Sequence, residues 1–230
     1  MWHGLELAQF VADGLARAEQ ELSREQAVSG LDALDEVSLH GVLERILSES
    51  GFGLLREVPY PSLTPEQKRD PQRKRCDFVL TPERGQRIRD ALANRRRKTP
   101  EPTLFAAADT EHAEADPTDC YWIEVKCVGQ FTCTHGVPGP NTTYASELMN
   151  AVRKDTAKLA GDALIARGVL LLLLFCETRA IAEHDLAVAA NRTLDRGGSL
   201  GQVRLRCAPI PDRIGNRLVT AATFEMNRAD

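Results

Sequence analysis

The chain has 230 residues, 43% of them hydrophobic and 27% charged, with a formal net charge of −4 at pH 7. This size and composition are typical of one soluble globular domain with a substantial core, and the negative charge argues against indiscriminate nucleic-acid binding. The chain starts without the basic and apolar regions of a secretory signal, and its longest apolar stretch, residues 168–176, is too short to span a bilayer. We therefore expect one cytoplasmic domain, residues 1–230, that does not contact a membrane.

The N-terminal third has two helical patterns followed by two strands. Apolar residues recur at helical spacing over 2–27, an N-terminal extension, and again over 38–50, where Ser38 is the expected N-cap and Gly51 ends the helix. Strands are expected over 54–60 and over 76–81.

Residues 83–119 have the composition of an insertion. The segment 84–97 is basic and predicts a helix, whereas 99–119 is rich in proline, alanine and acidic residues and predicts a mobile segment. A strand follows over 121–128, and two glycines, two prolines and four threonines within 132–143 predict a loop.

The C-terminal third alternates between helices and strands. Its expected elements are a long helix over 144–167, a strand over 169–176, a helix over 180–194 and closing strands over 203–207 and 218–224. The complete order predicts an α/β sandwich with a mixed sheet, whose core covers about 36–226.

Basic residues are concentrated around the second strand. Residues 66–98 contain twelve Lys or Arg against five Asp or Glu, a charge of +7, so the remainder carries −11. A solvated loop explains this pattern, but so does a phosphate-contacting rim. The rim candidates nearest the second strand are Lys68, Arg69, Arg73, Lys74 and Arg75.

The strand over 121–128 carries two charges in an apolar run. Period-two geometry places Glu124 and Lys126 on one face, while Ile123, Val125 and Cys127 face the core. Burying such charges costs desolvation, and folding does not require them. Asp77 is a second isolated carboxylate in an apolar strand. If the two strands are adjacent, these groups form a site for a divalent cation.

Two carboxylates and an ammonium are suited to phosphodiester hydrolysis. Hard oxygen ligands suit Mg²⁺ or Mn²⁺, the cation lowers the pKa of a bound water, and an ammonium can stabilise the charge that develops on the phosphate. The residues that would do this are Asp77, Glu124 and Lys126.

These residues resemble the motif of the PD-(D/E)xK nuclease superfamily, whose restriction-endonuclease-like core runs helix, three strands, helix, strand. The resemblance covers about 36–176. It implies that Asp77 and Glu124 hold the metal, that the Val125 carbonyl completes its ligands, and that Lys126 acts on the water. The family often adds a glutamate from the first core helix, for which Glu44 is the match.

The sequence departs from this family pattern in two places. Cys76 stands where the family name has proline, and Asp77 and Glu124 are 47 positions apart, so 83–119 must loop out of the sheet. His40, on the same flank of its helix as Glu44, and Gln130 are accessory candidates.

The long helix after this strand carries further charged residues. Lys154 and Lys158 are expected on the face opposite its apolar stripe, where they are solvated and can at most contact a phosphate, with no part in the metal site. Asp155 and Arg153 lie at the edges of the stripe, which favours structural pairing.

The cysteines offer another metal hypothesis. Six cysteines without regular spacing favour a reduced compartment. Cys120, Cys127, Cys133 and His135 fall within sixteen residues and could form a zinc site, although buried thiols explain the cysteines better.

The residues and the resemblance together indicate a Mg²⁺- or Mn²⁺-dependent nuclease acting on DNA, in defence or repair. The alternative is a catalytically inactive nuclease-like scaffold that binds nucleic acid or protein as a subunit of a larger system. A homodimer is also an expectation, with residues 2–27 as the interface.

Overall fold

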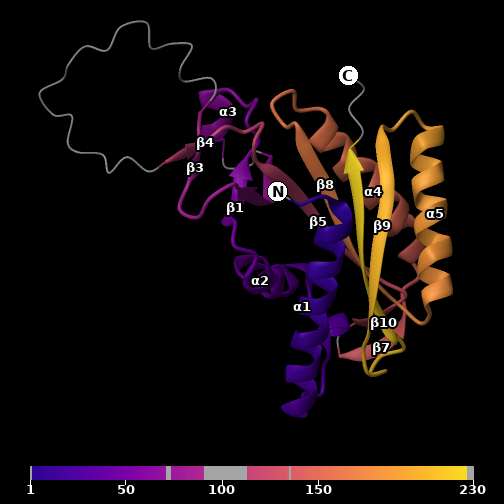
Figure 1. The fold of residues 1–230 in the computed structure, drawn as a ribbon. Coiled ribbons are helices and arrows are strands. Elements are labelled where there is room, and N and C mark those ends of the chain that lie inside the picture. Colours follow the sequence, from indigo (N-terminus) through magenta and orange to yellow (C-terminus); the bar gives the residue numbers. More distant parts are fainter. Residues whose placement is uncertain (1, 71–73, 91–112, 135, 227–230) are drawn as a thin grey trace, which may run out of the picture.

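The structure, a computed structural model, describes residues 2–70, 74–90, 113–134 and 136–226. Within these ranges it is an α/β protein, with a six-stranded mixed sheet between helices (Figure 1). The strand order is β1-β2-β5-β8-β10-β9, and only β5 and β8 are parallel neighbours. The strands are β1 (Gly53–Pro59), β2 (Arg75–Thr81), β5 (Tyr121–Gly129), β8 (Arg167–Cys176), β9 (Leu200–Pro209) and β10 (Leu218–Met226).

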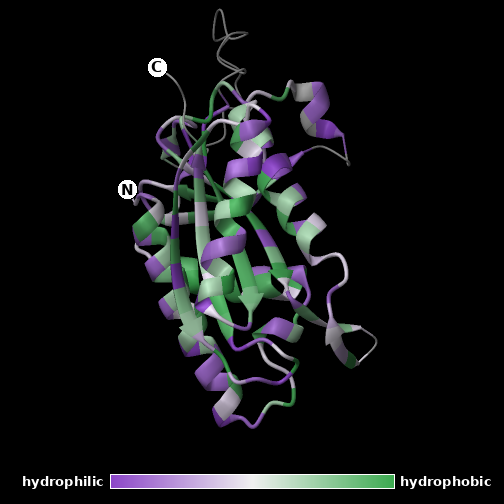
Figure 2. Cartoon of the chain, turned by 90° about the vertical axis from the view of Figure 1, so that its right-hand side faces the viewer, coloured by the Kyte–Doolittle hydropathy of each residue, from purple (hydrophilic) through white to green (hydrophobic). Residues whose placement is uncertain are grey.

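Four helices of more than ten residues in the described ranges cover the two faces of the sheet. Helices α1 (Gly4–Arg24) and α2 (Glu36–Ser48) share one apolar cluster with the sheet, while α4 (Tyr144–Ala160) and α5 (Arg179–Asp195) share another on the opposite face. In Figure 2 the apolar strands lie at the centre and the helices carry their polar residues outward. Smaller elements are η1 (Leu31–Ala33), α3 (Pro65–Arg69), the pair β3 (Arg87–Ile88) and β4 (Glu114–Ala115), and the hairpin β6 (Phe131–Thr134) and β7 (Val137–Pro140).

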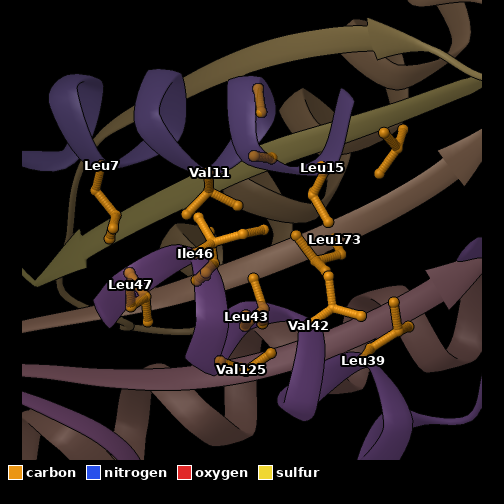
Figure 3. Packing of buried hydrophobic residues seen from close by; sticks show 14 of the residues in the cluster. Leu7, Val11, Leu15, Leu39, Val42, Leu43, Ile46, Leu47, Val125 and Leu173 are labelled. Carbon is orange, nitrogen blue, oxygen red and sulfur yellow. The ribbon is translucent and has the colours of Figure 1, made fainter. Parts of the chain in front are cut away.

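Side chains from α1, α2 and the sheet interlock in the first cluster (Figure 3). Leu7 and Leu15 of α1 and Leu43 of α2 are fully buried, as are Val125 of β5 and Leu173 of β8. Burying each such side chain contributes about 1.5–3 kcal/mol. This packing holds α2 against the end of the sheet where β2 and β5 carry their charged residues.

The predicted mixed α/β sheet and its main elements are confirmed, with corrections at several boundaries. The N-cap of α2 is Asp35, whose carboxylate accepts a hydrogen bond from the Ser38 amide at 2.8 Å, so the N-cap lies three residues before the expected Ser38. Helix α4 ends at Ala160 rather than at 167.

The segments between the main elements differ more from the predictions. The basic helix predicted over 84–97 is wrong for 84–90, which form a turn and β3, and the rest lies outside the described residues. The predicted loop 132–143 contains most of the β6–β7 hairpin. Helix α3 was not predicted, although Thr64 and Gln67 form a capping box at its start.

In the described part of the chain, none of the helices has the length and apolarity needed to cross a bilayer.

Candidate functional site

The site is centred where β2 and β5 stop pairing. Their antiparallel register runs from Leu80 opposite Tyr121 to Phe78 opposite Ile123, so continuing it by one residue places Asp77 opposite Glu124. The ladder ends there, and the Val125 amide donates instead to Oδ2 of Asp77 at 2.7 Å. The two predicted acids therefore lie on neighbouring strands, next to the point where the pairing of those strands ends.

Glu124 is an enclosed carboxylate with two partners. It is 2% exposed. The Tyr60 hydroxyl donates to Oε1 at 2.5 Å, and Nζ of Lys158 lies 3.8 Å from Oε2. Lys158 is held in turn by the buried Asp155, 2.5 Å from its Nζ. The Glu124 carboxylate therefore accepts a hydrogen bond from the neutral Tyr60 hydroxyl. Its nearest cation, Lys158, lies farther away and also pairs with Asp155.

Both acids bind their protons more tightly than free carboxylic acids do. Burial, and then the charge of Asp77, raise the pKa of Glu124 from 4.5 to about 7. Burial also raises the pKa of Asp77, although the hydrogen bond from the Val125 amide and the charge of His40 oppose the rise. The surrounding groups therefore do not fully neutralise the negative charge of the two ionised carboxylates. A cation bound beside them would stabilise that charge.

Lys126 lies on β5, two residues after Glu124, and forms an ion pair with a glutamate of α2. Its Nζ lies 2.7 Å from Oε1 of Glu36, in the first turn of α2. Burial lowers the pKa of Lys126, but the hydrogen bond and charge of Glu36 outweigh this and the pKa is raised. Lys126 therefore stays protonated at neutral pH.

A cleft of about 540 Å³ opens beside these residues, between the start of α2, the end of β5 and one side of α4. Three ammonium groups line it, those of Lys126, Lys154 and Lys158, together with three carboxylates, those of Glu36, Glu147 and Asp155. An anionic ligand entering this cleft would meet the lysines next to the enclosed Glu124.

The other predicted residues occupy different surroundings. Glu44 is half-exposed and pairs with Arg56 of β1 at 2.6 Å, so the α2 carboxylate that reaches Lys126 is Glu36. Gln130 does not face the cleft, because its Oε1 accepts from the Glu177 amide at 2.9 Å. His40 is buried beneath α2, with its ring centroid 5.6 Å from that of Phe78.

The predicted basic rim is only partly described. Arg69 and Lys74 are exposed, and Arg75 lies 4.0 Å from the carboxylate of Glu57. Lys68 belongs to α3, and Arg73 lies outside the described residues.

Sequence reasoning missed four residues of this site: Glu36, Tyr60, Asp155 and Lys158. Lys158 was expected to be solvated on the outer face of its helix, but its Nζ lies 3.8 Å from Oε2 of Glu124. The structural pairing expected for Asp155 is confirmed by its ion pair with Lys158. The buried stripe of α4 includes Asp155, between Val152 and Leu159, rather than at its edge. The position of Asp155 in an apolar stripe was the available sequence signal. A buried carboxylate requires a cation nearby, and Lys158, three residues later, is that cation.

The cysteines do not gather into a site. Cys120 is buried and Cys127 half-buried, but Cys133 is exposed, contrary to the expectation of buried thiols. His135 lies outside the described residues. Among the residues that the structure describes, the one group with metal-ligand spacing contains His40, Glu57 and Asp77 and no cysteine.

The structure thus places the carboxylates of Asp77 and Glu124 next to a cleft that three lysines and three acids line. Comparison of the chain with protein-family models, with curated proteins and with solved structures gave no match.

Proposed function

We propose that the chain is a Mg²⁺- or Mn²⁺-dependent nuclease with a restriction-endonuclease-like core that hydrolyses DNA phosphodiester bonds. The observation that supports the proposal is that Asp77 and Glu124 lie on neighbouring strands next to the point where the pairing of β2 and β5 ends, with Lys126 two residues after Glu124. The element order α2, β1, β2, β5, α4, β8 also agrees with the core of the family that the motif resembles.

The donor set fits the cation that this function needs. Asp77 and Glu124 would hold it through carboxylate oxygens and Val125 through its carbonyl, and the raised pKa of Glu124 marks a site where additional positive charge is favourable. Once bound, the cation offsets charge on the phosphate and lowers the pKa of a bound water.

The chain's own cations contribute independently of the metal. Lys126 is kept protonated and oriented by Glu36, so its ammonium can hold the attacking water or a phosphate oxygen. Lys158 sits between Asp155 and Glu124 and lines the same cleft. It can contact the phosphate of a strand lying there, while Tyr60 fixes the rotamer of Glu124 by its hydrogen bond.

The test is cleavage of plasmid and linear DNA with Mg²⁺ or Mn²⁺. Asp77→Asn and Glu124→Gln should abolish cleavage, while Asp195→Asn, which changes an exposed acid at the end of α5, should leave it unchanged. Cleavage that survives both site substitutions removes the proposal, and an RNA substrate in parallel defines the preferred nucleic acid.

The alternative function is an inactive scaffold of the same fold. One observation favours it: Lys126 and Glu124 already have partners within the chain, Glu36 and Tyr60 respectively. Calorimetry separates the two functions, because a scaffold should bind neither Mg²⁺ nor Mn²⁺, whereas the nuclease should bind and should lose affinity in Glu124→Gln.

A further inference from the structure

A second group of ligand-type side chains adjoins Asp77 on the side of α2. One ring nitrogen of His40 and one carboxylate oxygen each of Glu57 and Asp77 lie within 4.8 Å of one another. The three come from α2, β1 and β2, which the chain brings together at the edge of the sheet. Glu124 is not part of this group.

His40 supplies the independent observation that points to a ligand. The residue is 8% exposed, and its buried Nε2 has no hydrogen-bond partner among the residues that the structure describes. Leaving a buried polar atom unpaired costs about 1–3 kcal/mol. Phe78 packs against the edge of the ring, with 5.6 Å between centroids. The imidazole is thus held in place, with one nitrogen close to two carboxylates.

Glu57 occupies an irregular position in β1. The pairing of β1 with β2 passes from Arg56 opposite Phe78 to Val58 opposite Cys76, so Glu57 and Asp77 face one another without a ladder pairing between them. Glu57 has a φ of 52°, in the left-handed region that is uncommon for residues other than glycine. Among the described residues, its carboxylate forms an ion pair with Arg75 at 4.0 Å, and both side chains are partly exposed, so this pair is a weak competitor for the carboxylate.

We propose that His40, Glu57 and Asp77 form a binding site for a first-row transition-metal dication, Mn²⁺ or Zn²⁺, separate from the cation held by Glu124 and sharing Asp77 with it. An imidazole nitrogen with two carboxylates is a donor set for these metals, whereas Mg²⁺ prefers oxygen alone. Ligand atoms about 2.1 Å from one ion lie roughly 3–4 Å apart, so a group whose atoms lie within 4.8 Å of one another needs to contract by no more than about 1–2 Å. The exposed Glu57 side chain can supply most of this movement.

The proposal does not require the chain to cut DNA, because it concerns binding of a metal by a different set of ligands. Asp77 is common to both sites, so its substitution cannot separate them. Glu124 belongs to the proposed nuclease site alone, and His40 and Glu57 belong to the second site alone. Variants at Glu124 therefore test the nuclease site, and variants at His40 and Glu57 test the second metal site.

The experiment uses the full chain with Mn²⁺ alone as the probe, and pulsed electron paramagnetic resonance detects ¹⁴N coupled to the bound ion. Coupling is expected in the parent protein and in Glu124→Gln, and it should disappear in His40→Gln. Glu57→Gln, a change at an exposed residue that does not threaten the core, should weaken the nitrogen-coupled Mn²⁺ site by about tenfold or more. His184→Gln changes an exposed histidine of α5 and is the matched control.

Two results would overturn the proposal. One is bound Mn²⁺ without ¹⁴N coupling in the parent protein. The other is nitrogen coupling that persists in His40→Gln or binding that is unchanged in Glu57→Gln. DNA cleavage in Mg²⁺, measured on the same variants, tests the proposed nuclease function separately. That proposal is refuted if Glu124→Gln still cleaves DNA.

Discussion

Replacing Glu124 by glutamine isolates the electrostatic cost of the buried carboxylate. In the folded protein its pKa is about 7, against an ordinary value of 4.5, mainly because of burial and then of Asp77. A difference of this size corresponds to about 3 kcal/mol of free energy of unfolding. The folded state binds the proton more tightly than the unfolded chain, so this contribution is fully present below pH 4.5 and is lost as the pH rises through about 7.

Glutamine has nearly the same shape, can accept the Tyr60 hydrogen bond, and does not titrate. In metal-free buffer the parent protein should therefore lose stability relative to Glu124→Gln between pH 5 and pH 8, by up to about 3 kcal/mol. Urea denaturation at pH 5, 6, 7 and 8 measures this difference, with Asp195→Asn as the control. Adding Mg²⁺ or Mn²⁺ at a hundred times its dissociation constant should return about 2.7 kcal/mol to the parent at pH 8 and little to the variant. Parallel stability curves for parent and variant across this range would refute the reasoning.

Three further substitutions probe the surroundings of the site. Tyr60→Phe removes the donor to Glu124, so the pKa of Glu124 should rise further and stability at pH 8 should fall by about 1–3 kcal/mol, as urea denaturation measures; an unchanged pH profile would contradict this. Lys158→Met should reduce DNA cleavage more than Lys154→Met, since only Lys158 approaches Glu124; equal effects of the two on the cleavage rate would show that this contact is unimportant. Leu43→Ala empties fully buried volume between α2 and the sheet and should cost about 2–5 kcal/mol of unfolding free energy; a loss below 1 kcal/mol would contradict the packing described here.

The elements could be predicted where a local pattern is repeated along the chain. The buried strand β8 is a continuous apolar run, and β5 is an apolar run with Glu124 and Lys126 at alternate positions, so the local pattern alone identifies them. Boundaries decided by a single side chain were less predictable: Asp35 and Ser38 are both good N-caps, and only the structure shows that Asp35 accepts from the Ser38 amide. The β6–β7 hairpin contains prolines and has little local signal of a strand.

The residues of the candidate site also fall into those that a local pattern predicts and those that depend on packing. Asp77, Glu124 and Lys126 could be named because period two specifies which face of a strand a residue occupies. A helical pattern likewise specifies a face, but it does not specify how far along the sheet the helix lies. Glu36 and Glu44 are eight residues apart, about 12 Å along the axis of α2, and only the packing of that helix decides which of them meets Lys126.

The same limit explains why His40 was assigned only an accessory role. Its significance depends on Glu57, whose irregular backbone at the edge of the sheet is not encoded in any periodic pattern. Asp77 adjoins both groups: its charge raises the pKa of Glu124, and one of its carboxylate oxygens lies within 4.8 Å of ligand atoms of His40 and Glu57. If both groups bind cations, Asp77 is the carboxylate that couples them. Occupancy of one site should then change the affinity of the other, and Mn²⁺ titrations of Glu124→Gln and Glu57→Gln measure that coupling directly.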